Sequence, residues 1–325
     1  MTRLIASPLQ SPMTRMLDNP ATGARADAAP DAVPTPCIAA VAVLCASQRR
    51  DNPIARLSRL VADLPLDERR TLAGGLLDEI LPPLGPEPRC VFLAGATDVA
   101  AARSTTPSGL PMDVLHDRDQ YRGTAGSLRD FAVGLDPASY ILVVAGTEWT
   151  GFSLTGLAAA MLGLGADVVL PRLACRTPLA VWLVRAGVLE DVPPVGYSDF
   201  KEQALPRLAS RRDVRVLTLP PSCRASDLVS VRTLPSYLRA VRLAHGAPAG
   251  GEAGEPWRSR FAVVEPGAEV EPGAILHDSV VLAGARVERG AVLARSVVDA
   301  GVVVRSGERV VDAVLCRDAC GGRSR

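Results

Sequence analysis

The sequence contains few aromatic residues, no excess of either charge and no long apolar run. Aromatic residues make up 4% of its 325 residues, which argues against a surface on which the bases of single-stranded nucleic acid stack. The 36 basic and 35 acidic residues nearly cancel, so no polyanionic partner is expected. The longest apolar run, Ile38 to Ala46, is too short to cross a bilayer, and the first residues lack the parts of a secretory signal. These absences predict a cytoplasmic protein without nucleic-acid or membrane partners.

Cysteine is present in an odd number and without the spacing of a metal site. No two cysteines form the Cys-x-x-Cys pair of zinc sites, and their scatter does not indicate a disulfide framework. Reduced thiols in the cytosol are the simplest account, and no metal ligands are predicted from the cysteines. The seven cysteines are Cys37, Cys45, Cys90, Cys175, Cys223, Cys316 and Cys320.

Residues 37–246 alternate between short apolar runs and segments with helical spacing. This alternation predicts an α/β domain with a Rossmann-like, mostly parallel sheet, while residues 1–36, which show no apolar period, are expected to form a disordered tail. The predicted strands are Ile38–Cys45, Cys90–Ala94, Met112–Leu115, Ile141–Val144, Asp167–Leu170, Leu179–Val184 and Val214–Leu219. The predicted helices are Leu57–Leu66, Leu72–Leu84, Leu154–Leu164 and Leu234–His245, the last with Leu234, Tyr237, Leu238, Val241 and Leu243 toward the sheet.

The C-terminal part follows a different period. A Gly- and Pro-rich linker over residues 247–258 separates it from the α/β domain. Glycines then recur with gaps of 6 and 11 residues from Gly267 to Gly307, and Val264, Val281 and Val298 keep the same 17-residue step. An inward apolar residue near every sixth position predicts a short left-handed parallel β-helix of about three coils over residues 259–317, followed by a tail over 318–325. Because open sheet edges favour association, an oligomer is expected.

A pair of glycines before a helical segment is the first candidate for a binding site. Gly123 and Gly126 flank Thr124 and Ala125, and glycine allows a positive φ or a close approach of the backbone to a ligand. The N–H groups at the start of the helix could receive ligand oxygen atoms. The strand that follows ends at a turn, and open α/β sheets hold ligands at that edge. An ordinary loop with convenient glycines is the alternative interpretation.

Two other polar segments complete the list of local signals. Arg49 and Arg50 follow the first predicted strand and are candidates for phosphate contacts, although simple solvation is the alternative. Further along, Asp199 is expected to cap a helix while Glu202 reaches back to its amide, as in a capping box.

Several segments together resemble the sugar-1-phosphate nucleotidyltransferases, the family that makes nucleotide-diphosphate sugars. Arg122-Gly-Thr-Ala-Gly126 is similar to the family's Leu-Gly-Thr-Ala-Gly loop, and Ile141 to Leu154 to its strand and Asn-Gly-Asp turn. The resemblance covers about residues 38 to 315 and implies a fold of the nucleotide-diphospho-sugar transferase type with a C-terminal β-helix. It implies that Arg122, Gly123, Thr124, Ala125 and Gly126 bind a nucleotide or nucleotide sugar, that Gly146 and Thr147 are substrate-contact candidates, and that Mg²⁺ is the cofactor if the protein is active.

The sequence departs from the family pattern at the positions that carry the chemistry. The first metal aspartate would align with Thr147 and the second near Ser230, and neither residue is acidic; Asp227 lies three residues before Ser230. The phosphate loop after the first strand contains no glycine, and the family's Glu-Lys-Pro stretch is missing before Pro178. Glu148 is left as a weak catalytic candidate and a possible substitute metal ligand. The resemblance therefore predicts a nucleotide-binding protein with doubtful or divergent catalysis, in effect a possible pseudoenzyme.

Two other functions stay open. The chain could be a noncatalytic regulatory or assembly subunit of a nucleotide-sugar synthase, either as a homo-oligomer or with an intact nucleotidyltransferase. It could also be a β-helix acyltransferase, a class that needs a general base, and His277 is the only histidine of the repeat.

Overall fold

The computed structural model describes residues 37–45, 53–81, 88–94, 104–105, 111–116, 122–246, 261–317 and 323–324. The predictions for the tail 1–36, for Arg49 and Arg50, for the linker 247–258 and for most of the tail 318–325 lie outside these ranges. Residues Arg323–Ser324 of that tail form β21, which pairs antiparallel with β20 (Val314–Arg317).

Within the described residues, an eight-stranded sheet with the order β3-β4-β2-β1-β5-β8-β7-β9 forms the centre of the α/β domain. The pairs β1–β2, β1–β5, β2–β4 and β7–β9 are parallel, so the predicted mostly parallel sheet is confirmed. Two strands are exceptions: β8 runs antiparallel to both β5 and β7, and the short edge strand β3 runs antiparallel to β4. The bounds are β1 Ile38–Leu44, β2 Arg89–Ala94, β3 Ser104–Thr105, β4 Pro111–His116, β5 Tyr140–Ala145, β7 Val168–Arg172, β8 Val181–Arg185 and β9 Val214–Thr218.

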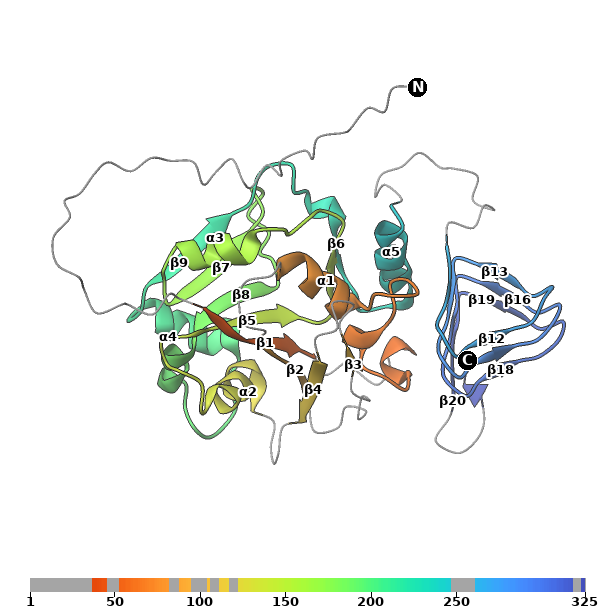
Figure 1. Ribbon diagram of the computed structural model, residues 1–325, viewed down its shortest axis with the longest axis horizontal. Coiled ribbons are helices and arrows are strands. Elements are labelled where there is room, and N and C mark those ends of the chain that lie inside the picture. The colour runs from red at the N-terminus through yellow and green to blue at the C-terminus, as the bar shows by residue number, and fades with distance from the viewer. Residues whose placement is uncertain are drawn as a thin grey trace, which may run out of the picture.

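Helices cover both faces of this sheet (Figure 1). The helices are α1 Leu72–Ile80, α2 Gly123–Ala132, α3 Leu157–Gly163, α4 Leu205–Ala209 and α5 Leu234–Ala244, and a π-helical turn spans Phe200–Ala204. Alternate residues of β1 and β5 contribute to two separate cores, one with α1 and α3 and the other with α2, as the alternation of side chains along a strand requires. None of the helices in the described ranges has the length and hydropathy needed to cross a bilayer.

The helix predicted over Leu57–Leu66 is wrong. The segment contains one 3₁₀ turn at Val61–Asp63, a second 3₁₀ turn at Pro53–Arg56 precedes it, and Pro65 forms an isolated bridge with Thr71. Its apolar residues are buried as the spacing suggested, but the backbone is irregular. The reason is tertiary, since Ser58 and Arg59 contact the C-terminal part of the chain and the apolar residues of the segment share one core with β-helix residues such as Val263.

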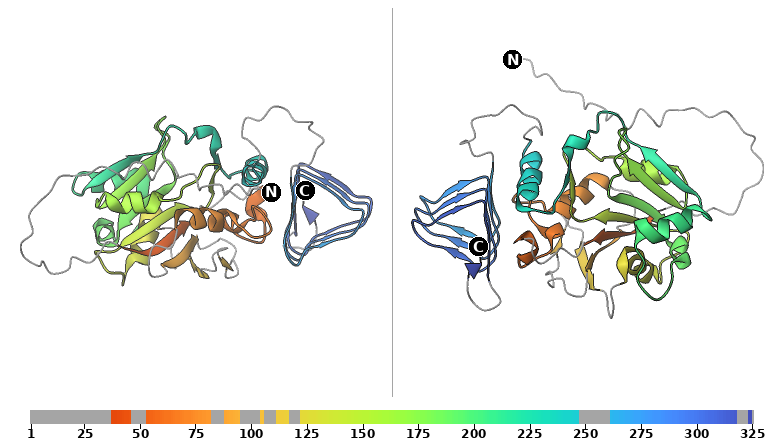
Figure 2. Two further views of the ribbon diagram at one scale, coloured as in Figure 1. Left: turned by 45° about the horizontal axis from the view of Figure 1, so that its top comes forward. Right: turned by 180° about the vertical axis from the view of Figure 1, so that it is seen from behind.

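The C-terminal part is a parallel β-helix built from stacked coils, with a triangular outline in the left view of Figure 2. Each strand pairs with the strand 17 residues later, as in Val264 with Val281 and Leu276 with Leu293, so the predicted repeat is confirmed. The recurring glycines all have positive φ, from 71° to 92°, which explains why glycine keeps the register at the turns. The handedness stays a prediction.

Three sheets make up the sides of the β-helix. Their orders are β11-β14-β17-β20-β21, β12-β15-β18 and β13-β16-β19. The bounds are β11 Ala262–Val264, β12 Glu269–Val270, β13 Ile275–His277, β14 Ser279–Val281, β15 Arg286–Val287, β16 Val292–Ala294, β17 Val297–Val298, β18 Val303–Val304 and β19 Arg309–Val311.

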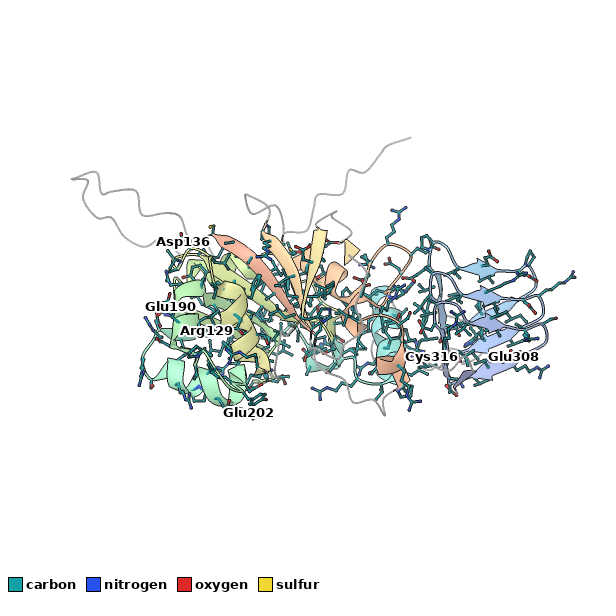
Figure 3. The ribbon with its side chains drawn as sticks, turned by 90° about the horizontal axis from the view of Figure 1, so that it is seen from below. Arg129, Asp136, Glu190, Glu202, Glu308 and Cys316 are labelled. Carbon is teal, nitrogen blue, oxygen red and sulfur yellow. The ribbon has the colours of Figure 1, made fainter. Side chains whose placement is uncertain are left out.

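One side of the β-helix packs against the α/β domain through α5 and the segment of the two 3₁₀ turns. The carboxylate of Asp299, only 2% exposed, accepts hydrogen bonds from the backbone nitrogen of Ser58 at 2.9 Å and from its hydroxyl at 2.6 Å. Arg59 pairs with Glu265 at 2.8 Å. In Figure 3, Cys316 lies on this side of the β-helix and Glu308 on the far side. The two parts therefore share a polar and apolar interface.

The helix α5 lies between the α/β domain and the β-helix (Figure 1), which corrects the prediction that it covers the large sheet. Its buried residues belong to a core that includes Val263 and Val280 of the β-helix, and Arg242 pairs with Asp278 at 3.0 Å. Leu243, predicted to face the sheet, is only partly buried.

Candidate functional site

The candidate site lies at the carboxyl edge of β1 and β5, where an open α/β sheet holds its ligands. The antiparallel strand β8 begins at this edge, because Ala145 donates its N–H to Ala180 at 2.8 Å. The chain then turns through residues 146–147 into β6 (Glu148–Thr150), which pairs antiparallel with β10 (Leu228–Ser230). A small second sheet therefore stands at the edge of the large one.

The register of this small sheet joins the two positions that the resemblance equates with metal aspartates. Glu148 lies directly opposite Ser230, and Val231 donates its N–H to the carbonyl of Thr147 at 2.6 Å. Directly opposed residues of an antiparallel pair place their side chains on the same face. The fold thus brings the backbones of Thr147 and Ser230 close together, but the side chain opposite Ser230 is that of Glu148, and neither Thr147 nor Ser230 carries a carboxylate.

Glu148 is the carboxyl group of this site, and it is poorly solvated. Its Oε2 atom is buried and has no hydrogen-bond partner among the described residues. Burial raises the pKa of Glu148 above its ordinary value, while the charges of Lys201 and Arg232 and the N–H of Ala180 act in the opposite direction. The positions of Lys201 and Arg232 relative to this carboxyl group follow from their own contacts.

Lys201 was missed by the sequence-based prediction. It belongs to the π-helical turn, a rare element that often marks functional sites, and its Nζ lies 4.9 Å from the centroid of the Trp182 ring. The sequence did contain a signal, because Lys201 is the only lysine among the 36 lysine and arginine residues.

The turn that carries Lys201 is held by its own cap. Asp199 accepts from the N–H groups of Lys201 and Glu202, so the predicted capping role of Asp199 is confirmed. The residue that reaches back to the Asp199 N–H is Gln203, at 3.0 Å, and not Glu202. The extra residue in a π turn explains the shift from the third to the fourth position after the cap.

Arg232, also missed, follows β10 directly. Its Nε donates to the hydroxyl of Ser230 at 3.2 Å. A guanidinium therefore lies one hydrogen bond away from a side chain that the resemblance aligns with a metal carboxylate. No pattern in the sequence marks this arginine, since it is one of many.

The predicted nucleotide loop forms the start of α2, but two of its amides are already used. The N–H groups of Ala125 and Gly126 both donate to the carbonyl of Ser198, at 2.9 and 3.4 Å. The expectation that these two amides receive ligand oxygen atoms is therefore wrong. The hydroxyl of Thr124 accepts from the N–H of Phe200 at 2.8 Å and bonds the Asp199 carboxylate at 3.0 Å, which ties the loop to the turn that carries Lys201.

Arg122 and Gly123 hold the neighbouring loop in place. The guanidinium of Arg122 pairs with Asp130 at 2.9 Å and donates to the carbonyls of Gly196 and Pro193. A Cβ on Gly123, whose φ is 73°, would lie 2.5 Å from the Ser198 carbonyl oxygen. Direct contact of these residues with a nucleotide stays a prediction.

Gly146 has a packing role. It is buried, and a Cβ there would lie 2.5 Å from the Cβ of Ala62 and 2.8 Å from Cγ1 of Val43. The close approach of these chains requires glycine, and contact of Gly146 with a substrate stays a prediction. Thr147, which is partly exposed, is still a candidate for such a contact.

The residues present do not fit a magnesium site of the family type. Magnesium prefers several oxygen ligands, chiefly carboxylates, whereas the two aligned positions hold Thr147 and Ser230, and Glu148 lies next to the first and opposite the second. Within the described ranges, no group of three His, Cys, Asp or Glu side chains is close enough to hold a metal ion. The two cations beside Glu148 also oppose the approach of a divalent cation.

His277 does not have the surroundings of a general base. Both of its ring nitrogens are buried and have no hydrogen-bond partner among the described residues. A general base must come within hydrogen-bond reach of the substrate. The β-helix acyltransferase hypothesis therefore receives no support from this geometry.

Comparison with known proteins bears on the C-terminal part. Residues 258–314 match the family described as GlmU-like, C-terminal hexapeptide. This part is thus similar to the hexapeptide region of that family. An α/β domain with a mostly parallel sheet and a C-terminal β-helix is the architecture that the resemblance to sugar-1-phosphate nucleotidyltransferases implies.

Two solved structures are similar to the chain. A homolog of Mycobacterium tuberculosis Rv0371c from Mycobacterium sp. strain JC1 is 20% identical with a TM-score of 0.41, over 62% of this chain and 94% of that chain. HddC from Yersinia pseudotuberculosis is 12% identical with a TM-score of 0.42, over 63% of this chain and 98% of that chain. Similarities of this size do not bear on function. No curated protein matches the sequence.

Proposed function

We propose that this nucleotidyltransferase-like protein binds a nucleotide or nucleotide sugar at the carboxyl edge of its sheet and has lost, or carries out differently, the transfer reaction of the family. The main support for this proposal is the pairing of β6 with β10. This pairing keeps the two family positions together while Thr147 and Ser230 occupy them. A scaffold that preserves the place of the metal but not its ligands is suited to binding without the usual turnover.

The contacts that connect the parts of the site support a binding role. Thr124 joins the glycine loop to the turn of Lys201, and Lys201 in turn lies over Trp182 of β8. The loop, the turn and the sheet edge are thus one connected unit. A ligand that touches both the loop and the edge would be held by elements that are already ordered, which limits the entropy lost on binding.

The transfer reaction of the family needs metal ligands that this site does not provide. Transfer of a nucleotidyl group to a sugar phosphate depends on positioning and on neutralising phosphate charge, which metal ions commonly supply. Glu148 alone is a weak metal ligand here, because burial favours its neutral form and two cations stand near it. Magnesium would be the cofactor only of an active form, and the residues present do not provide its usual ligand set.

The test is a comparison of binding with turnover in the full chain. We expect thermal stabilisation and calorimetric binding with at least one nucleotide or nucleotide sugar, and no release of pyrophosphate from nucleoside triphosphates with hexose-1-phosphates and magnesium. Thr124→Val should weaken binding, whereas the matched variant Thr124→Ser keeps the hydroxyl and should bind normally. Pyrophosphate release would refute the loss of catalysis, and the absence of binding across the common bases would refute the proposal.

A second candidate function, a regulatory or assembly subunit, is favoured by the outer sides of the β-helix. Ile275 and Val311 are 57% and 53% exposed on the outer strands of the sheet β13-β16-β19, and an open sheet edge is a site at which another chain can pair. The partner would be a second copy or an intact nucleotidyltransferase. Light scattering should show an oligomer that Ile275→Glu with Val311→Glu reduces in size, and a monodisperse monomer would refute this role.

A further inference from the structure

Four side chains at the sheet edge form a cluster with an unusual balance of charge. The cluster consists of Glu148, Ser230, Lys201 and Arg232, and we call it the cationic cluster. It combines one buried carboxyl group with two cations that act on that group electrostatically. Its members come from β6, β10, the π turn and the loop after β10, so only the folded chain assembles it.

Arg232 brings a positive charge to the face that Glu148 and Ser230 share. Glu148 and Ser230 face the same way because they are directly opposed in the antiparallel pair. The 3.2 Å hydrogen bond from Arg232 Nε to the Ser230 hydroxyl brings the guanidinium to this face. A fixed positive charge therefore stands where the family alignment would place a metal ligand and its ion.

Lys201 brings a second positive charge to the same edge of the sheet. Its ammonium lies over the indole of Trp182, an arrangement that stabilises a cation and limits its movement. Trp182 pairs with Val143 near the end of β5, so this ammonium is held close to the same edge. Lysine binds phosphate as a point charge, whereas arginine can bind it with two parallel hydrogen bonds.

The charges of the cluster differ from those of a metal-dependent site. In a metal-dependent site, two carboxylates hold a divalent cation, and this cation neutralises the phosphates of the substrate. In the cationic cluster, one carboxyl group faces two permanent cations, so the protein itself carries the positive charge. Such a site repels a divalent cation and attracts an anion.

We propose that Lys201 and Arg232 bind the diphosphate group of a nucleotide sugar directly, without a divalent cation, in place of the metal ion of the family's active members. This inference rests on the proposed function, because it names how the same site would hold the phosphates. Glu148 lowers the net positive charge of the cluster when it is ionised.

The experiment uses inorganic pyrophosphate as the probe and the full chain in excess EDTA. Reductive methylation with ¹³C-formaldehyde labels Lys201 and the N-terminal amine, the two kinds of primary amine in the chain, and preserves their charge. We expect pyrophosphate to shift the Lys201 signal in a saturable way. Calorimetry on the unlabelled protein gives the affinity.

Variants separate a built site from general attraction. Lys201→Gln and Arg232→Gln should each weaken pyrophosphate binding about tenfold, as the loss of one charge-assisted hydrogen bond predicts. Arg207→Gln, an equal change of charge at an exposed position of α4, should leave the affinity unchanged. Glu148→Gln should keep or strengthen binding, whereas loss of a metal ligand would weaken it.

The outcomes distinguish this inference from the proposed function. Binding of pyrophosphate or nucleotide sugars only with magnesium, or equal losses in Lys201→Gln and Arg207→Gln, would overturn the metal-free site and leave the nucleotide-binding proposal standing. Pyrophosphate binding in EDTA without any binding of nucleotides or nucleotide sugars would support the cationic cluster and overturn the proposed function.

Discussion

Replacing Gly123 by alanine probes the contact that joins the glycine loop to the turn of Lys201. Gly123 has φ of 73°, and an added Cβ would lie 2.5 Å from the carbonyl oxygen of Ser198 and 2.8 Å from Cε2 of Tyr197. Backbone atoms cannot rotate away, so the segment from Tyr197 to Phe200 must move. This segment includes the acceptor for the amides of Ala125 and Gly126.

The expected cost is the sum of two effects. A left-handed conformation costs a residue with a Cβ about 1 to 2 kcal/mol. Displacement of Ser198 weakens two hydrogen bonds, each with a net value of about 1 kcal/mol. Gly123→Ala should therefore lower the free energy of unfolding by about 3 to 4 kcal/mol.

Gly134→Ala is the matched control. Gly134 has φ of 90°, but nothing lies within 4 Å of its added Cβ. It should show the conformational cost alone, about 1 to 2 kcal/mol. Urea denaturation measures both variants, and the ¹³C signal of methylated Lys201 reports whether its turn has moved.

Equal losses of stability in the two glycine variants would refute the reasoning. That result would mean that the approach of Gly123 to Ser198 is not tight. An unchanged Lys201 signal in Gly123→Ala would likewise show that the glycine loop does not position the π turn.

Two further predictions concern the domain interface and the buried carboxyl group. Asp299→Ala removes the buried acceptor that joins the β-helix to the α/β domain and should lower the free energy of unfolding, measured in urea, by about 2 kcal/mol. The control Asp312→Ala, at an exposed ion pair, should lower it by less than about 1 kcal/mol. Equal losses in the two variants would contradict the buried interface. Burial raises the pKa of Glu148 from its ordinary value of 4.5, so the stability it contributes is present below that value and lost as the pH rises through the folded-state pKa. Glu148→Gln should remove this decline in plots of Tm against pH, and an unaltered pH profile would show that Glu148 is well solvated.

Much of the fold followed from local patterns. The apolar runs located β1, β2 and β5 within a residue or two, because buried parallel strands are continuously apolar. The same reasoning failed over Leu57–Leu66, where helical spacing of apolar residues served burial between two domains instead of a helix. Spacing reports which residues are buried, and the surrounding structure decides the backbone that buries them.

The candidate site was only partly accessible from the sequence. The alignment of Thr147 and Ser230 with metal positions was available, but their cross-strand proximity required β6 to pair with β10. The resemblance implied that Arg122 and Gly146 contact ligands, and this stays a prediction. The structure adds that both hold the chain together, a role that depends on partners distant in the sequence.

The sequence by itself determined the β-helix, because each coil repeats the same turns and inward residues at a 17-residue step and pairs only with its neighbours. The tertiary structure alone decided that Glu148, Lys201 and Arg232 share one site. Their charges interact only after long-range strand pairing brings them together, and burial then sets the strength of that electrostatic interaction.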